Sequence, residues 1–397
     1  ARTFEGDTIN FASALSGDNN VTVTGNADID GAVTSIAVLS VSGTSNIGAD
    51  ITTSGTQTYT DAVTLSANVT LTTSNDTFTF PSTINSADST RRNLTIATGG
   101  NTAVAFFSGA IGGVNPLGEI VITGALDLNV VVTDITSISV SGVSNICCWI
   151  TATGTQTYSG TVTLSGTDEY INLTGTTIQF AAVDGAKNLR ITGNLDLNGA
   201  ITEIGTLRVT GTSNLGANVT TTGTQIYSGA VTLSTNATLT SSNDNFTFSD
   251  AIDSDSSTRN LTLNPGSGTI AVSGAIGGGE ALGTLTITQS GGTTFGGRVT
   301  AATVTLTDTA DDADISFNAG ITIDTLNTAS QGYDINLYGA TNTVTNAVTF
   351  SNTGTLKINN GNTLITNFNG GVTATAPSSI TMQGTIRDQS GTGTITL

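Results

Sequence analysis

The sequence lacks histidine altogether, and its 397 residues include only two cysteines, four prolines, one methionine and one tryptophan. Without histidine, the Ser-His and Cys-His pairs of many hydrolases cannot be assembled. Two adjacent cysteines cannot build the disulfide framework of a small secreted domain. No run of about 18 apolar residues occurs, so the sequence predicts no membrane-spanning helix.

Basic residues are also scarce, with 10 lysines and arginines against 29 aspartates and glutamates, which gives a net charge of −19. Nucleic acids and anionic membrane surfaces bind through clusters of basic side chains, so neither is an expected partner. The acidic excess leaves binding of a divalent cation open. The chain begins ARTFEG without an initiator methionine, and we expect it to be a processed or excised piece.

The chain is rich in threonine, serine, asparagine, valine, isoleucine and leucine, and it contains 48 glycines. Threonine, valine and isoleucine fit the pleated surface of a strand, while glycine and asparagine suit the tight turns between short strands. Hydrophobic residues make up 37% of the chain, which is enough to bury a core. The composition therefore predicts an all-β protein.

A long segment occurs three times. GNADIDGAVTSIAVLSVSGTSNIG, which starts at Gly25, returns in altered form from Gly124 and from Gly193. Each copy continues through an octet (SGTQTYTD, TGTQTYSG or TGTQIYSG) and later through a basic residue followed by Asn-Leu. The predicted organisation is leading coils at 1–24, a first repeat at 25–123, a second at 124–192, a third at 193–288, and degenerate coils of the same solenoid at 289–397.

The second repeat is shorter because it lacks the segment that carries SGAIGG in the other two, at 108–113 and 273–278. Such a loss would leave strands of a β-sandwich unpaired, whereas it only shortens a stack of coils. We therefore predict a β-solenoid with coils of roughly 20–30 residues. Each octet is predicted to form a coil corner, at which glycine turns the chain and tyrosine packs against or caps the bend.

Three runs, 153–164, 258–278 and 284–306, resemble the β-strand repeats of very large secreted bacterial surface proteins of the filamentous-haemagglutinin and autotransporter-adhesin type. The resemblance implies a right-handed parallel β-helix in the form of an elongated rod. It also implies an extracellular or cell-surface location and a non-enzymatic role in adhesion, biofilm matrix or filaments. The partners that it implies are further copies of the chain, head to tail or side by side, and host or matrix glycans or proteins.

Two other functions remain open. Parallel β-helices include polysaccharide lyases and hydrolases, whose sites gather acidic and basic side chains on one face. Asp184, Lys187 and Arg190 form the best such cluster, but Lys187 aligns with Arg92 and Arg259, which indicates an architectural position. A phage tail fibre is a weaker alternative, for which trimerisation would be the sign.

Two acidic clusters are candidate calcium sites, because Ca²⁺ prefers several hard oxygen ligands close together. Neither matches an EF-hand or a GGxGxD nonapeptide, and solvated loops explain them equally well. No other cofactor is expected. The clusters are Asp250, Asp253 and Asp255, and Asp308, Asp311, Asp312 and Asp314.

Cys147, Cys148 and Trp149 replace small or polar residues of the other repeats. On a strand, one cysteine would face inward and the other outward, with Trp149 on the side of Cys147. Three interpretations are open: local repacking, a contact point with another chain, or a vicinal disulfide. Tryptophan is enriched at interface hot spots and an exposed thiol can bridge chains, so the three residues are a candidate interface.

Overall fold

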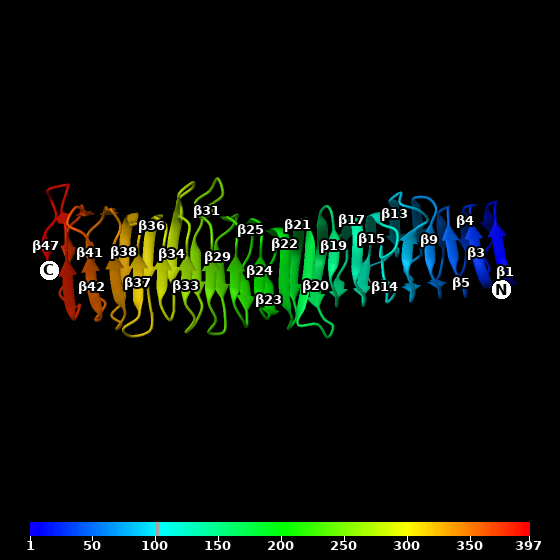
Figure 1. Cartoon of the computed structure of the whole chain (residues 1–397), viewed down its shortest axis with the longest axis horizontal. Coiled ribbons are helices and arrows are strands. Elements are labelled where there is room, and N and C mark those ends of the chain that lie inside the picture. The colour runs from blue at the N-terminus through cyan, green and yellow to red at the C-terminus, as the bar shows by residue number, and fades with distance from the viewer. Residues whose placement is uncertain (101–102) are drawn as a thin grey trace. The chain divides into compact units, whose positions relative to one another are not determined.

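The computed structural model describes residues 1–100 and 103–397. Strands account for 55% of it, and parallel coils stack on one another as a β-solenoid of about 20 turns (Figure 1). Within the described residues there is no helix, and hence none that is long and apolar enough to cross a membrane. The prediction of an all-β, parallel solenoid is confirmed.

The chain folds as two compact units, Ala1–Asn194 and Leu195–Leu397. In each unit, successive coils place their strands in parallel register, so that the strands form faces along the stack. The strand β22 (Asn188–Leu197) contains the boundary between the units.

The strands of the N-terminal unit form three faces. The first consists of the start of β3 (Val21–Ile29), β5 (Leu39–Val41), β8 (Gln57–Tyr59), β11 (Phe78–Phe80), β14 (Val104–Phe107), β16 (Ala125–Leu128), β18 (Ser144–Ile146) and the end of β20 (Gln156–Leu164). The second consists of the end of β3, β6 (Ser45–Ile47), β9 (Val63–Leu65), β12 (Ile84–Ser86), the start of β17 (Val132–Val140), β19 (Ile150–Ala152) and the start of β21 (Tyr170–Asp184). The third consists of β4 (Val33–Ile36), β7 (Ile51–Thr53), β10 (Val69–Thr72), β13 (Arg92–Ala97), β15 (Leu117–Thr123), the rest of β17, the start of β20 and the middle of β21. The strands β1 (Arg2–Phe11) and β2 (Leu15–Ser16) precede them.

The C-terminal unit has the same arrangement. Its first face consists of β24 (Leu207–Val209), β27 (Gln225–Tyr227), β30 (Phe246–Phe248), β33 (Ile270–Val272), β35 (Thr293–Phe295), β37 (Asp314–Phe317), β39 (Asp334–Leu337), β42 (Thr355–Ile358) and β45 (Ser379–Met382). Its second face consists of β25 (Ser213–Leu215), β28 (Val231–Leu233), β31 (Ile252–Ser254), the starts of β36 (Val299–Leu306) and β38 (Ile321–Thr328), β40 (Thr341–Val344), β43 (Ile365–Phe368) and β46 (Thr385–Arg387). Its third face consists of β23 (Ile201–Ile204), β26 (Val219–Thr221), β29 (Ala237–Thr240), β32 (Leu261–Asn264), β34 (Leu282–Ile287) and the ends of β36 and β38. A short separate sheet contains β41 (Val348–Thr349), β44 (Val372–Thr373) and β47 (Ile395–Thr396).

The core is made of side chains that alternate along each strand, because successive residues of a strand point to opposite faces. Inward valine, leucine, isoleucine and phenylalanine residues are almost fully buried. Stacking of the coils places similar side chains over one another, and aromatic rings of neighbouring coils stack. The ring centroids of Tyr59 and Phe80 lie 5.3 Å apart, and those of Phe80 and Phe107 lie 5.1 Å apart.

Coils are as short as 18 residues, which is below the predicted range. Asn46 donates to Asp28 on the coil 18 residues before it, while the backbone of Glu119 donates to Asn93 across 26 residues. The short coils are possible because three-residue strands are joined by turns that contain little more than a glycine and a small polar residue. The boundaries of the three repeats stay predictions.

The octet has both a corner and a strand. Its glycine lies in the turn, as predicted, and is required for close approach rather than for an unusual φ: a Cβ on Gly154 would lie 2.8 Å from the carbonyl oxygen of Thr136. Its glutamine and tyrosine lie on the strand, fully buried. The hydroxyl of Tyr158 donates to Oε1 of Gln156 (2.9 Å), and Nε2 of Gln156 donates to the carbonyl oxygen of Thr174 (2.8 Å). Tyrosine therefore packs in the core and does not cap the bend.

Candidate functional site

The most unusual surface of the N-terminal unit is the corner between β18 and β19, which holds Cys147, Cys148 and Trp149. The Trp149 side chain is 49% exposed. Its indole N–H donates to the carbonyl oxygen of Tyr170 on the next coil (3.2 Å), and Tyr170 is itself 37% exposed. A hydrogen bond therefore fixes an exposed aromatic side chain, which reduces the entropy that it would lose on binding a partner.

The two cysteines form a disulfide with each other. Cys147 is buried and Trp149 is exposed, so the prediction that Trp149 lies on the side of Cys147 was wrong. The reason is local: the three residues form a turn between strands, where the alternation of a strand does not apply. Of the three interpretations of these residues, the structure contains the vicinal disulfide. Neither cysteine has a free thiol to bridge chains in this form.

Apolar side chains continue from this corner onto the preceding coil. Val132 pairs with Ile150, which places Val131, 39% exposed, next to Trp149. We call Val131, Cys148, Trp149 and Tyr170 the apolar corner. Exposed apolar groups that gather at one place mark contact surfaces more often than isolated ones do. That the apolar corner contacts a partner stays a prediction.

The first acidic cluster does not converge. Asp250 accepts a hydrogen bond from the backbone N–H of Ala251, and Asp253 accepts one from that of Gly279. Asp255 forms a bidentate ion pair with Arg259, at 2.8 and 2.9 Å. The Arg259 guanidinium lowers the pKa of the Asp255 carboxyl.

The second acidic cluster lies on the loop between β36 and β37 and at the start of β37. Asp314 accepts a hydrogen bond from Nδ2 of Asn336 (2.7 Å), and Asp312 adopts a left-handed φ of 60° in the turn before β37. In the described part of the chain, three or more acidic, cysteine or histidine residues nowhere gather in a way that could hold a metal. Calcium binding at either cluster stays a prediction.

The cluster of Asp184, Lys187 and Arg190 lies at the turn from β21 to β22. The backbone N–H of Lys187 donates to the carbonyl oxygen of Gly185 (2.9 Å), and Oδ1 of Asp184 is buried without a hydrogen bond. The basic residues that align with Lys187 form ion pairs four residues back, Arg92 with Asp88 and Arg259 with Asp255. These pairs support an architectural role for the basic position.

The asparagine of the basic-Asn-Leu motif has a role that the sequence analysis missed. Oδ1 of Asn93 accepts a hydrogen bond from the backbone N–H of Glu119 (2.9 Å), and Oδ1 of Asn260 accepts one from that of Thr284 (2.8 Å). The side chain thus pairs a backbone donor of the next coil. Its recurrence after a basic residue was the available signal.

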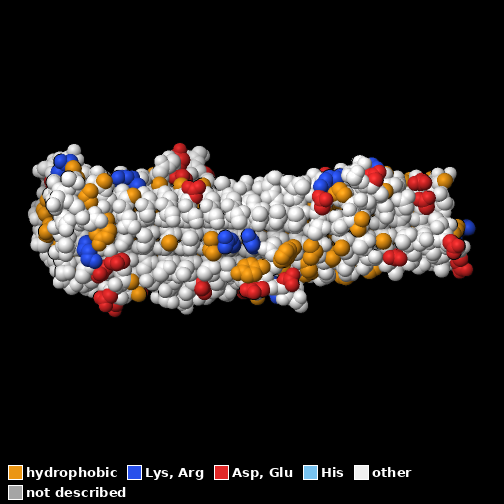
Figure 2. Space-filling view, in the orientation of Figure 1, with side chains coloured by type: hydrophobic (Ala, Val, Ile, Leu, Met, Phe, Trp, Pro, Cys, Tyr) orange, Lys and Arg blue, Asp and Glu red, His pale blue; other side chains and the backbone are white. Residues whose placement is uncertain are grey.

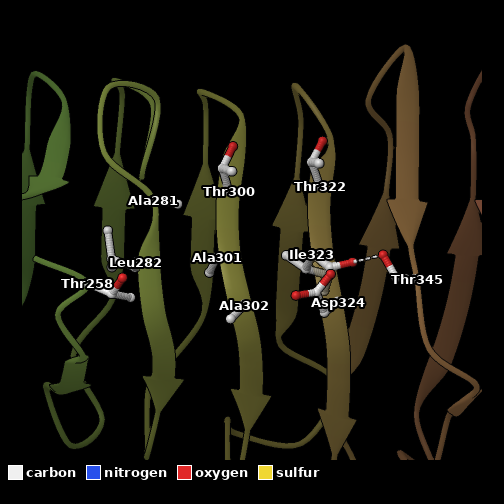
Figure 3. A pocket seen from close by; sticks show the side chains of 10 residues that line it. All are labelled: Thr258, Ala281, Leu282, Thr300, Ala301, Ala302, Thr322, Ile323, Asp324 and Thr345. Carbon is white, nitrogen blue, oxygen red and sulfur yellow. Dashed lines mark hydrogen bonds between the residues drawn. The ribbon is translucent and has the colours of Figure 1, made fainter.

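The C-terminal unit has an open groove of about 320 Å³ across β34, β36 and β38 (Figure 3). Thr300 and Thr322 occupy paired positions on adjacent strands, and Asp324 supplies a carboxylate. The groove is lined by Thr258, Ala281, Leu282, Thr300, Ala301, Ala302, Thr322, Ile323, Asp324 and Thr345. This lining contains a single acidic side chain, whereas glycoside hydrolysis commonly uses two carboxylates.

The face visible in Figure 2 is mostly neutral, with scattered acidic and basic side chains and a row of apolar side chains near its middle. Comparison with known proteins found no family model, no curated protein and no solved structure that matches the chain.

Proposed function

We propose that this chain is a structural, non-catalytic segment or subunit of an extracellular bacterial surface fibre or adhesin. The observation that carries the proposal is the stacking of parallel coils within each unit, around a core of buried side chains that repeats from coil to coil. Each coil buries its apolar side chains against its neighbours, which is how solenoid proteins extend in one direction. The resemblance to secreted β-strand repeats supports the location at the cell surface.

Assembly end to end is part of the proposal. Met382, Ile395 and Leu397, on and beside the outermost strands of the C-terminal unit, are 45%, 40% and 41% exposed. Exposed apolar side chains on and beside these strands suit contact with another strand-bearing surface. A head-to-tail contact of this kind can propagate, because the two joined surfaces differ. Further copies are therefore the first proposed partner, and host or matrix glycans or proteins are the second.

Negative-stain electron microscopy and sedimentation velocity over a range of concentrations test the assembly. We expect particles that lengthen as concentration rises, and a Met382→Lys variant that stays short because a charge at the edge opposes stacking. A Thr232→Lys variant, which changes an outward residue of β28, is the matched control. Particles of one length at every concentration would contradict self-assembly.

The rival function, cleavage of polysaccharides, has a direct assay. We expect no new reducing ends and no unsaturated products when the chain is incubated with acidic and neutral polysaccharides. Appearance of either product would replace the proposal with an enzyme.

A further inference from the structure

The third face of the C-terminal unit carries a regular array of neutral polar side chains, which we call the hydroxyl face. It contains two columns of side chains that cross five coils. The residues of the columns lie on β29, β32, β34, β36 and β38, except that two of them directly precede β29 and β32. One column is Asn236, Asn260, Thr284, Thr303 and Thr325, and the other is Thr238, Thr262, Thr286, Thr305 and Asn327.

The register of the columns is fixed by backbone pairing. Thr284 pairs with Thr303, and Thr303 pairs with Thr325. In the second column, Thr262 pairs with Thr286. The inward residues between the two columns, such as Leu285 and Val304, are fully buried, so the columns point outward. Figure 1 shows β34, β36 and β38 side by side in this unit.

Asparagine side chains hold the start of the array in place. Oδ1 of Asn236 accepts a hydrogen bond from the backbone N–H of Asn260 (2.9 Å), and Oδ1 of Asn260 accepts one from that of Thr284 (2.8 Å). Threonine is restricted at χ1, so its hydroxyl positions are also well defined. The array is therefore rigid before anything binds to it.

The geometry repeats in two directions. Neighbouring coils are about 4.8 Å apart, and residues two apart on a strand are separated by roughly 6.6–6.8 Å. All ten positions are neutral, although the chain has 29 acidic residues. A rigid, neutral and periodic surface selects a partner that is itself periodic and uncharged.

We propose that the hydroxyl face binds ice. Hexagonal ice presents rows of oxygen atoms with closely similar repeats in two perpendicular directions. The threonine hydroxyl donates and accepts hydrogen bonds, so each can hold one water of such a layer. The inference goes beyond the proposed structural role and does not depend on it.

The equivalent face of the N-terminal unit has lost this pattern. Thr95 pairs with Val121, and Glu119 lies at the position that corresponds to Thr284. A charge and an apolar side chain interrupt the hydroxyl rows there. Ice binding is therefore assigned to the C-terminal unit.

The test uses the full chain and three measurements: thermal hysteresis, the shape of a single ice crystal, and inhibition of ice recrystallisation. We expect the wild-type chain to shape ice crystals and to show hysteresis that rises with concentration. Thr303→Tyr places a bulky ring in the middle of the array and should abolish most of both effects. Thr232→Tyr, on the second face, is the control and should leave them unchanged. Circular dichroism confirms that both variants fold.

Three results would overturn the inference. The first is the absence of ice shaping at every concentration of folded wild-type chain. The second is an equal loss of activity in Thr303→Tyr and Thr232→Tyr, which would exclude the hydroxyl face as the site. The third is that the wild-type chain has no effect on ice but sediments together with crystalline chitin or cellulose, and that Thr303→Tyr no longer does so. The periodic partner would then be a polysaccharide.

Discussion

The third faces of the two units share one backbone arrangement and differ in surface chemistry. In both, an asparagine side chain accepts a hydrogen bond from the next coil, at Asn93 and at Asn260. The next coil then presents Glu119 and Val121 in the N-terminal unit, but Thr284 and Thr286 in the C-terminal unit. The comparison shows that outward side chains vary freely once the backbone pairs and the inward side chains are satisfied.

A second comparison concerns corners. The turn that holds Cys147, Cys148 and Trp149 in the second repeat holds Gly216, Ala217 and Asn218 in the third. Oδ1 of Asn218 accepts a hydrogen bond from the backbone N–H of Thr238 (2.8 Å), whereas Trp149 donates its indole N–H to the next coil. The same turn thus links coils in two different ways.

The largest effects are expected in the core, and they should be equal in the two units. Phe180→Ala removes the ring that stacks on Tyr158, with centroids 5.5 Å apart, and Phe248→Ala removes the ring that stacks on Tyr227, at 5.1 Å. Each should lower the free energy of unfolding by about 3–5 kcal/mol, measured by urea denaturation. The outward substitution Thr232→Ala should change it by less than about 0.5 kcal/mol. A cost under about 1 kcal/mol for either phenylalanine would show that its coil can repack.

Raised pH should destabilise both units through their buried tyrosines. Burial raises the pKa of Tyr59, Tyr158 and Tyr227 far above the usual value of 10.0, so these residues stay protonated while the chain is folded. The unfolded chain ionises above pH 10 and the folded chain does not, so the stability present below pH 10 is lost as pH rises. The loss should reach about 1.4 kcal/mol per pH unit for each tyrosine.

Absorbance of tyrosinate measures this directly. Of the six tyrosines, Tyr59, Tyr158 and Tyr227 should ionise only when the chain unfolds. Tyr333 should ionise later than an ordinary tyrosine, because burial raises its pKa to about 12. A smooth titration of all six near pH 10 in folded protein would contradict the buried positions.

The buried Gln-Tyr pair should have an intermediate effect. Gln225→Leu leaves the hydroxyl of Tyr227 and the carbonyl oxygen of Thr240 without their partners, at a cost of about 1–3 kcal/mol. Adding Tyr227→Phe should recover part of that cost, because the unpaired hydroxyl is removed. Gln156→Leu, alone and with Tyr158→Phe, is the matched test in the other unit, and additive costs in either double-mutant cycle would show that the pair is not coupled.

The asparagine of the third face should matter equally in both units. Asn93→Ala and Asn260→Ala each remove one acceptor for a backbone N–H and should each cost about 1 kcal/mol in urea denaturation. A cost in only one unit would show that the outward side chains above it, and not the backbone pairing alone, stabilise that face.

The smallest effect is expected at the corner. Trp149→Asn copies the third repeat and should change the free energy of unfolding, measured by urea denaturation, by less than about 0.5 kcal/mol.

A thiol assay of the folded chain should detect no thiol before reduction and two after it, because Cys147 and Cys148 are bonded to each other. Dimers in non-reducing electrophoresis would show instead that one cysteine bridges chains.

The sequence alone determined the fold class, because a parallel solenoid repeats its chemistry along the chain. Alternation of apolar residues predicted the strands, and the short second repeat predicted a stack of coils rather than a sandwich. The motifs around Gly154 and Asn93 were found for the same reason, although the asparagine's acceptor role was not. The 18-residue coils were not predicted, because turn length depends on how closely two coils approach.

Only the tertiary structure decided which residues lie over one another. Register between coils comes from backbone hydrogen bonds between residues of neighbouring coils, such as those from the N–H of Gly43 to the carbonyl oxygen of Gly25 and from the N–H of Thr98 to that of Thr123, and no local pattern specifies them. For that reason the buried place of Tyr158, the disulfide of Cys147 with Cys148, and the alignment of Thr284 with Thr303 and Thr325 became visible only in the folded chain. A local sequence sets what each strand can bury, and stacking sets what each side chain meets.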